Sequence, residues 1–375
     1  MITVVSISLV LLAMDYIAIL VWFIIGMNRL KPGTQSQQPM VSVVIAARNE
    51  EENISACLNG LASQDYPADK YEVLVVNDRS TDRTQERIKA FVQKDARFRL
   101  VNITEASPEM APKKWALDTG IRHSLGEIIL TTDADCIVRP GWISAMVRYF
   151  ENDVGIVAGF SPLDRFLSSS FLQRLIALDA LALAGIAAGS FGVGYPLTCT
   201  GRNLAYRKSV FRQVGGFEAI GHFTSGDDDL LLHRIRRKTD WKCRYAVDPD
   251  SVVSSKPPTT MKAFFSQRTR HASKGRHYDA VLKIGLIAVY LMNALLLISA
   301  VLVRLWPLFI GVFLAKSLFE FVSIRKTALL FGQQKALMVF PIAALIHPLY
   351  ILVFGLWGQF GNFKWKEDAY KARME

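Results

Sequence analysis

The chain has 375 residues, of which 51% are hydrophobic and 21% are charged, and its mean hydropathy is +0.23. This composition excludes an intrinsically disordered chain. The apolar excess is concentrated near the two ends, which predicts an integral membrane protein with a globular middle. The formal net charge of +11 then favours contact with anionic lipid headgroups, and we expect no nucleic-acid partner.

The first apolar segment, residues 3–26, contains one charge and exceeds the roughly 20 residues that cross a bilayer core. It lacks the basic start of a secretory signal, so we expect a retained anchor. Further apolar stretches lie at about 284–303, 305–324 and 337–360. Arg29 and Lys31 follow the first span directly, which predicts an outside N-terminus and a cytosolic segment 32–281.

The last apolar segment allows two interpretations. A fourth crossing would place the basic tail outside, against the positive-inside rule, so a re-entrant or interfacial segment stays open. The expected organisation is therefore an anchor at 1–30, a cytosolic domain at 31–281, transmembrane or re-entrant segments at 282–363 and a basic tail at 364–375. Basic residues near the second span are expected to face lipid headgroups: Arg268, Arg270, Lys274, Arg276 and Lys283.

The middle of the chain alternates between apolar runs and helical patterns. Strands are predicted at 41–47, 71–78, 98–103, 127–135 and 154–160, and helices at 49–64, 82–94, 113–124 and 140–151. Strands with almost no polar interruption, each followed by a helix, indicate an α/β fold with a parallel sheet covered on both faces. Such sheets bind ligands beyond the carboxyl ends of their strands.

Two carboxylates, Asp133 and Asp135, come at the expected end of the fourth strand. If the strand is extended there, residues i and i+2 share a face and both carboxylates can reach one hard cation. This predicts a Mg²⁺ or Mn²⁺ site that would neutralise a diphosphate. A solvated strand end is the alternative, and Asp78 at the end of the second strand favours the site.

Several motifs occur in a fixed order over residues 41–271. They are VSVVIAARNEE, VVNDRSTD, KKWAL, TTDAD, TGRNLAYRKSVF, SGDDDL and QRTRH. The series resembles the membrane-bound glycosyltransferases of family 2. The resemblance implies the nucleotide-sugar-binding GT-A fold, with a Rossmann-like mixed sheet, and inverting transfer from a nucleoside-diphosphate sugar, with a bias to UDP-sugars.

The resemblance also implies roles for single residues. Lys113 would supply positive charge to the diphosphate, with Lys114 as the alternative, and Asp135 would contact the metal together with Asp133. Asp227 of SGDDDL aligns with the acidic residue that serves as catalytic base in the family, and capping of the following helix is the alternative. Three successive carboxylates cannot all face one site, so the other two are expected to favour the helix N-terminus. The residues implied to bind the nucleotide sugar are Ala47, Glu50, Asp78, Lys113 and Asp133.

Acceptor binding is implied for two further motifs. Arg202 and Asn203 belong to TGRN, for which a turn with structural hydrogen bonds is the alternative. Gln267, Arg270 and His271 share one face of a helix expected at 261–277, with His where family members carry Trp; a basic surface helix is the alternative.

An apolar helix is also expected at 168–195, either docked at the membrane interface or buried in the domain core. The preferred function is transfer of a sugar to a lipid-linked or membrane-associated hydroxyl. A processive polysaccharide synthase is the main alternative, and a nucleotidyltransferase or a non-catalytic membrane scaffold fits fewer of the motifs.

Overall fold

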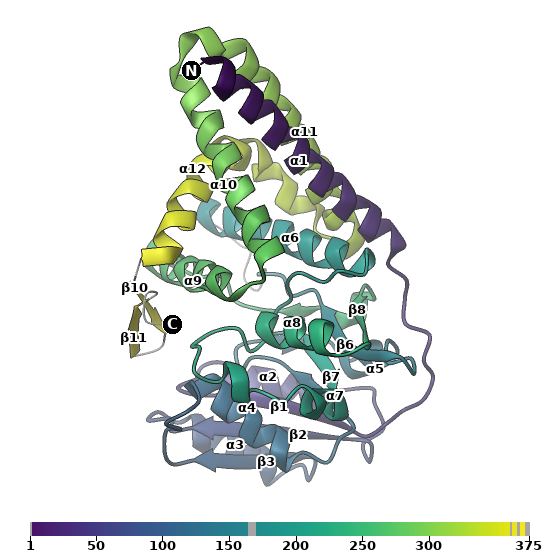
Figure 1. Cartoon of the computed structure of the whole chain (residues 1–375). Helices are drawn as coiled ribbons and strands as arrows, with labels where there is room; N and C mark the ends of the chain where they lie inside the picture. Colours follow the sequence, from purple (N-terminus) through teal and green to yellow (C-terminus); the bar gives the residue numbers. More distant parts are fainter. Residues whose placement is uncertain (1, 164–169, 361, 366–367, 372–375) are drawn as a thin grey trace. The chain divides into compact units, whose positions relative to one another are not determined.

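The computed structural model describes residues 2–163, 170–360, 362–365 and 368–371. Contacts divide these residues into two compact units. We call them the sheet unit, which holds residues 29–163 and 190–256, and the helix unit, which holds residues 2–28, 170–189 and those after 256. Figure 1 shows the elements of both.

A seven-stranded sheet, in the order β3-β2-β1-β4-β7-β6-β8, forms the centre of the sheet unit. The pairs β2–β3, β1–β2 and β1–β4 are parallel, whereas β7 runs antiparallel to both of its neighbours. The sheet is therefore mixed rather than parallel throughout. Its strands are β1 (Val41–Ala47), β2 (Tyr71–Asp78), β3 (Phe98–Ile103), β4 (Ile128–Thr131), β6 (Val154–Gly159), β7 (Leu204–Arg207) and β8 (Lys242–Ala246); β5 (Ile137–Val138) and β9 (Val253–Ser254) pair separately.

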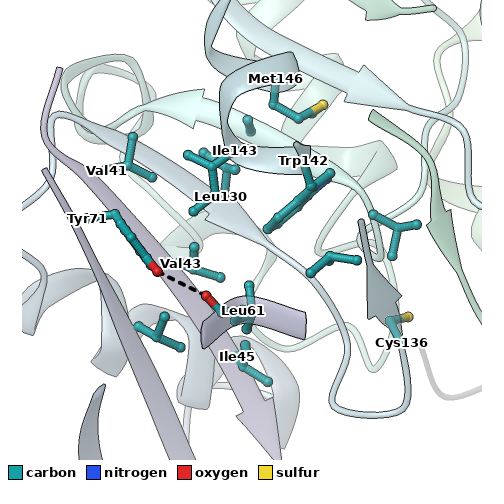
Figure 2. Packing of buried hydrophobic residues seen from close by; sticks show 14 of the residues in the cluster. Val41, Val43, Ile45, Leu61, Tyr71, Leu130, Cys136, Trp142, Ile143 and Met146 are labelled. Atoms are coloured by element: carbon teal, nitrogen blue, oxygen red, sulfur yellow. Dashed lines mark hydrogen bonds between the residues drawn. The ribbon is translucent and has the colours of Figure 1, made fainter. Parts of the chain in front are cut away.

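Helices pack on this sheet through apolar side chains. In α4, Gly120 allows close approach, because a Cβ there would lie 2.5 Å from a methyl group of Val44 on β1. Figure 2 shows part of the core, where the Tyr71 hydroxyl donates to the Leu61 carbonyl at 3.1 Å. The helices of this unit are α2 (Ile54–Ala62), α3 (Thr84–Val92), α4 (Pro112–His123), α5 (Trp142–Val147), α7 (Lys208–Gln213) and α8 (Asp229–Lys238).

The predicted strand at 127–135 is too long. Strand β4 ends at Thr131, and Asp133 to Asp135 lie in a turn in which the Cys136 amide donates to the Asp133 carbonyl at 3.1 Å. The expectation that the two carboxylates share the face of an extended strand is therefore wrong. The first three strands, by contrast, have the predicted bounds.

The helix unit contains five helices that are long and apolar enough to cross a membrane, by length and composition alone. Four correspond to the predicted spans, and the fifth, α6, to the apolar helix expected at 168–195. Residues 164–169, at the start of that prediction, lie outside the described residues. The elements are α1 (Ile2–Arg29), α6 (Phe171–Gly192), α9 (Met261–Ser273), α10 (Ala280–Val301), α11 (Trp306–Phe331), α12 (Phe340–Phe360), β10 (Asn362–Trp365) and β11 (Asp368–Lys371).

One basic residue expected at the lipid headgroups is buried instead. The side chain of Arg268, on α9, is 6% exposed and forms an ion pair with Asp179 of α6. An arginine can be buried in this way only when a carboxylate compensates its charge. Arg268 therefore joins two helices of this unit, and the prediction that it faces headgroups is wrong.

Candidate functional site

The loops after β1 and β2 form matching turns at the carboxyl edge of the sheet. Asn49 and Arg79 each have φ of +53°, a left-handed conformation that residues other than glycine seldom adopt. The loops hold each other in place, since Asn49 Oδ1 accepts from the Thr81 amide at 2.9 Å and Thr84 Oγ1 accepts from the Glu50 amide at 2.8 Å. Strain of this kind persists where the surrounding contacts fix it, typically at binding sites.

Three residues expected to bind the nucleotide sugar lie at the ends of β1 and β2 or in the loop that follows β1. Ala47 ends β1 and pairs with Asn77 of β2, so the neighbouring Asp78 lies at the same edge. Asp78 is buried and accepts from Arg79 Nε at 2.7 Å. Glu50 accepts from Asn53 Nδ2 at 2.7 Å and borders a pocket, which is lined by Asn49, Glu50, Glu51, Glu52, Asn53 and Asp82.

Lys113, in the first turn of α4, joins two of the predicted functional carboxylates. Its Nζ lies 2.9 Å from Asp133 Oδ1 and 3.0 Å from Asp227 Oδ2, and its side chain is 20% exposed. Burial alone would lower the pKa of Lys113, but the negative charges of Asp133 and Asp227 outweigh it and raise this pKa. Lys113 is therefore a fixed cation between residues that lie 94 positions apart in the sequence.

The neighbouring Lys114, the alternative to Lys113, has a different role. It is fully buried, and its Nζ donates to the carbonyls of Phe223, at 2.5 Å, and Ser225, at 2.7 Å. These carbonyls belong to the loop that leads to Asp227. Lys114 therefore holds this loop, and Lys113 is the lysine that faces the carboxylates.

The three aspartates of SGDDDL point to different partners. Asp227 faces Lys113. Asp228 is the N-cap of α8, accepting from the Asp229 amide at 2.7 Å and, through its other oxygen, from the Gly201 amide at 3.1 Å. Asp229 accepts from Thr198 Oγ1 and from the Cys199 amide, both at 2.9 Å. Only Asp227 thus combines a position at the site with a carboxylate that faces Lys113.

The TGRN loop packs directly against Asp227. A Cβ at Gly201 would lie 2.7 Å from Asp227 Oδ2, so a larger residue would displace the carboxylate. The next residue, Arg202, lies close enough to Asp135 for its positive charge to favour the ionised carboxylate. This loop therefore connects the predicted base with the predicted metal ligands.

Asn203 does not have the predicted acceptor-binding role. It is fully buried, its Nδ2 donates to the carbonyls of Phe160 at 2.8 Å and Ser251 at 2.7 Å, and its Oδ1 accepts from Trp142 Nε1 at 3.0 Å. The amide is occupied by these core hydrogen bonds. The alternative interpretation, a turn with structural hydrogen bonds, is the correct one for this residue.

The donor set around Asp135 fits a hard divalent cation. Burial raises the pKa of Asp135, and the charges of Asp133 and Glu50 raise it further. An added cation would relieve this concentration of negative charge. Within the described part of the chain, no three His, Cys, Asp or Glu side chains are grouped to hold a metal, so the fit is to an ion that also takes diphosphate oxygens and water.

Gln267, Arg270 and His271 lie on α9, which belongs to the helix unit. Their predicted spacing is preserved, because α9 is helical over Met261–Ser273 and residues i, i+3 and i+4 share a face. The other predicted site residues belong to the sheet unit.

Comparison with known proteins identifies the sheet unit. Residues 42–215 match the family model described as glycosyl transferase family 2. The chain therefore carries a family 2 glycosyltransferase domain, as the motifs predicted. The mixed sheet is that of the GT-A fold: the structure of a mannosyltransferase from Pyrobaculum calidifontis, in complex with GDP-Man and Mn²⁺, shares it with a TM-score of 0.61 at 21% identity, over 92% of this chain and 99% of that chain.

Two curated relatives show how far the sequence similarity extends. A probable glycosyltransferase of Bacillus subtilis is 30% identical over 244 residues, which are 64% of this chain and 56% of the relative. A beta-monoglucosyldiacylglycerol synthase of Synechocystis is 28% identical over 242 residues, which are 63% of this chain and 48% of the relative. The chain thus spans about half the length of these relatives.

Sequence reasoning missed two features of the site. The left-handed turns at Asn49 and Arg79 had a weak signal, since Asn adopts this conformation more readily than most residues, but Arg79 had none. Gly201, which leaves room for the Asp227 carboxylate, stood in a quoted motif without being assigned a role.

Proposed function

We propose that the chain transfers a sugar, with inversion, from a nucleoside-diphosphate sugar to a hydroxyl group of a lipid-linked or membrane-associated acceptor. The observation that carries this proposal is the position of Lys113, bonded to both Asp133 and Asp227. It joins a carboxylate suited to a metal–diphosphate complex to a carboxylate suited to proton transfer. A displacement at the anomeric carbon needs these two groups close together.

In the proposed reaction, Asp227 accepts the proton of the acceptor hydroxyl while that oxygen bonds to the anomeric carbon. The bond between this carbon and the diphosphate oxygen breaks from the opposite face, so the configuration inverts. Lys113 stabilises the negative charge that collects on the departing diphosphate. No covalent enzyme intermediate is needed.

Asp135, with Asp133, would hold Mg²⁺ or Mn²⁺, which when bound supplies further positive charge to the diphosphate. Ala47, Glu50 and Asp78 would bind the nucleoside and sugar of the donor, for which we expect a UDP-sugar. The left-handed turns at Asn49 and Arg79 would hold these side chains in place before the donor arrives. This arrangement limits the entropy lost on binding.

Arg202, Gln267, Arg270 and His271 would bind the acceptor, while Asn203 supports the loop from within the core. The similarity to a beta-monoglucosyldiacylglycerol synthase supports a lipid acceptor. The apolar α6 would lie at the membrane interface, where a lipid acceptor could reach the protein. A processive polysaccharide synthase is the alternative, and it differs in its product.

We propose an integral membrane protein with a cytosolic catalytic domain. Residues 1–30 would be the anchor, 31–281 the cytosolic domain, 282–363 transmembrane or re-entrant segments and 364–375 a basic tail. The length and apolar composition of the helices support this placement, as do Arg29 and Lys31 after the first span.

The test uses the full chain in lipid nanodiscs with a panel of nucleotide sugars, membrane lipids and Mn²⁺ or Mg²⁺. We expect release of a nucleoside diphosphate and a labelled product that extracts into organic solvent. Asp227→Asn should lower turnover by about 10²–10⁴-fold, and Asp135→Ala should also lower it strongly. The matched control Asp153→Asn, 56% exposed and paired with Lys242, should leave turnover unchanged. Label in a high-mass polymer would favour the synthase alternative, and unchanged turnover in both site variants would contradict the proposal.

A further inference from the structure

We propose that α6 and α12 form a surface that embeds in a single leaflet of the membrane, so that only α1, α10 and α11 cross it. The basic residues that follow α12 would then lie on the cytosolic side of the membrane, as the positive-inside rule favours. This inference rests on the membrane placement proposed above. It is argued from contacts within the helix unit and from the chain connections of α6.

Contacts among α1, α10 and α11 define the two ends of the helix unit. Thr327, near the end of α11, donates to the sulfur of Met27, at the end of α1, at 3.5 Å. Leu9 and Ala13, in the first half of α1, pack with Val312 of α11 and Met292 of α10. Because residue 30 continues into the sheet unit, we call the end with Met27 and Thr327 the domain end.

The first half of α12 lies near the domain end. The ring of Phe340, its first residue, is 5.1 Å from that of Phe321, which precedes Thr327 by six residues, or about 9 Å of helix. Phe340 and Ala344 also share a cluster with Leu178 of α6. The helix therefore begins beside α6.

The second half of α12 lies beside α9. The ring of Phe354 is 5.7 Å from Phe264 and 4.9 Å from Phe265. Gly358 contacts the last turn of α9 so closely that a Cβ there would lie 2.3 Å from that of Ala272. Only the short segment 274–279 separates α9 from the start of α10, which is at the domain end. Both ends of α12 are therefore on this side.

A crossing helix would show different contacts. The 21 residues of α12 span about 31 Å, enough to carry its end to the opposite end of the helix unit, where α10 meets α11 near Val303. The contacts with Phe265 and Ala272 place it beside α9 instead. Figure 1 shows α1, α10 and α11 reaching the same far end of this unit, while α6 and α12 remain away from it.

Chain connectivity gives an independent argument for α6. It is preceded by β6 and followed by β7, which are paired in one sheet, through residues 160–170 and 193–203, eleven in each connection. If α6 crossed the bilayer, one of these eleven-residue connections would have to return through the hydrocarbon, and eleven residues are too few to cross it as a helix, which takes about 20. Lipid-exposed backbone without regular structure leaves polar groups unpaired and does not occur. Both ends of α6 therefore lie on one side.

The two shallow helices are joined by polar contacts. Asp179 of α6 accepts from the Tyr350 hydroxyl of α12 at 3.3 Å and pairs with Arg268 of α9. Elsewhere, α12 exposes an apolar face that suits the acyl chains of one leaflet. This face includes Ile342, Leu345, Leu349, Val353, Leu356 and Phe360.

The experiment is cysteine labelling of the full chain in intact cells with a membrane-impermeant maleimide, before and after permeabilisation. Cys199 and Cys243 are first replaced by Ala, which leaves the two buried thiols Cys57 and Cys136, and this parent gives the background. Single cysteines then replace Leu125 in the sheet unit, Val303 between α10 and α11, Lys335 between α11 and α12, and Lys371 after α12.

We expect Leu125→Cys, Lys335→Cys and Lys371→Cys to react only after permeabilisation and Val303→Cys to react in intact cells. Lys371→Cys reacting like Val303→Cys, opposite to Leu125→Cys, would overturn the inference and leave the membrane placement intact. Val303→Cys and Leu125→Cys reacting from one side would instead refute the membrane placement. A fluorescent protein fused after Glu375 tests, without cysteine substitutions, on which side the segment after α12 lies. We expect it to fluoresce, as it would on the cytosolic side.

Discussion

Lys113 and Lys316 both contact carboxylates, but their surroundings differ. Lys113 is 20% exposed and joins carboxylates from two separate loops, Asp133 and Asp227. Lys316 is 1% exposed and pairs with Glu320, four residues later on α11, at 2.8 Å. Its Nζ also lies 2.9 Å from His347 Nδ1, and Tyr16 donates to Glu320 at 2.5 Å.

The balance of charge separates the two clusters. Around Lys113, two cations, Lys113 and Arg202, lie near four carboxylates, so negative charge is in excess and a divalent cation can be added. The four carboxylates are those of Asp133, Asp135, Asp227 and Glu50. In the helix unit, Lys316 and Glu320 balance each other, and their neighbours complete the hydrogen bonds. A balanced buried pair fixes the packing of helices, whereas an unbalanced one is suited to bind a ligand.

The largest effect is expected from a substitution in the cluster around Lys113. Asp227→Asn removes the proton acceptor but keeps the shape of the side chain, so we expect kcat to fall by about 10²–10⁴-fold. KM for the donor and the melting temperature should change little. Initial rates of nucleoside diphosphate release measure this effect. A variant that kept its kcat would show that Asp227 only neutralises Lys113.

Breaking the second cluster should affect stability instead. Lys316→Met leaves the Glu320 charge buried without its lysine, which we expect to cost about 3–5 kcal/mol of unfolding free energy. Thermal unfolding in detergent would measure it, and Lys316→Met with Glu320→Gln should regain part of the loss. The comparison fails if Lys316→Met lowers kcat of the remaining folded protein as strongly as Asp227→Asn does.

The parts predictable from sequence are those governed by local pattern. The uninterrupted apolar runs of β1, β2 and β3 predicted their bounds, because burial on both faces of a sheet demands such runs. The same reasoning predicted a strand that continues to residue 135, whereas β4 ends at Thr131 and a turn follows it. It was partly predictable that the three aspartates of SGDDDL face different partners, because successive helical positions diverge by about 100°.

Long-range partners explain the remaining failures. Asn203 was assigned to acceptor binding from its motif, and Arg268 to the lipid headgroups from its position near a predicted span. Each is instead buried with partners more than 40 residues away. The choice between Lys113 and Lys114 likewise depends on where α4 meets the loop at Phe223–Ser225. No local pattern contains this information.

A smaller effect tests the excess of negative charge. Because burial and neighbouring carboxylates raise the pKa of Asp135, the native state binds its proton more tightly than the unfolded state, and stability falls as pH rises through this pKa. Metal-free Asp135→Asn should therefore melt higher than the parent at pH 7, and the difference should vanish below about pH 4. Adding Mn²⁺ should raise the melting temperature of the parent alone.

The higher melting temperature of metal-free Asp135→Asn and the response of the parent alone to Mn²⁺ would distinguish a binding site from a structural cluster. A substitution in a structural cluster would lower the stability of the protein, as predicted for Lys316→Met. If Asp135→Asn melts lower than the parent at pH 7 without metal, the two clusters are alike and the contrast between them is wrong.

The smallest effect on stability is expected from an ion pair that is exposed to solvent. Lys242 and Asp153 pair at the surface of the sheet unit, with side chains 67% and 56% exposed. The hydrogen bond from Lys242 lowers the pKa of Asp153, so its stabilisation is present above the unfolded pKa of about 4 and disappears as pH falls through the native pKa. Water and salt screen this pair, and Asp153→Asn should cost less than about 1 kcal/mol at pH 7 and still less in 1 M salt. Thermal unfolding at both ionic strengths measures this cost; a loss as large as that of Lys316→Met would mean that burial does not set the difference between the clusters.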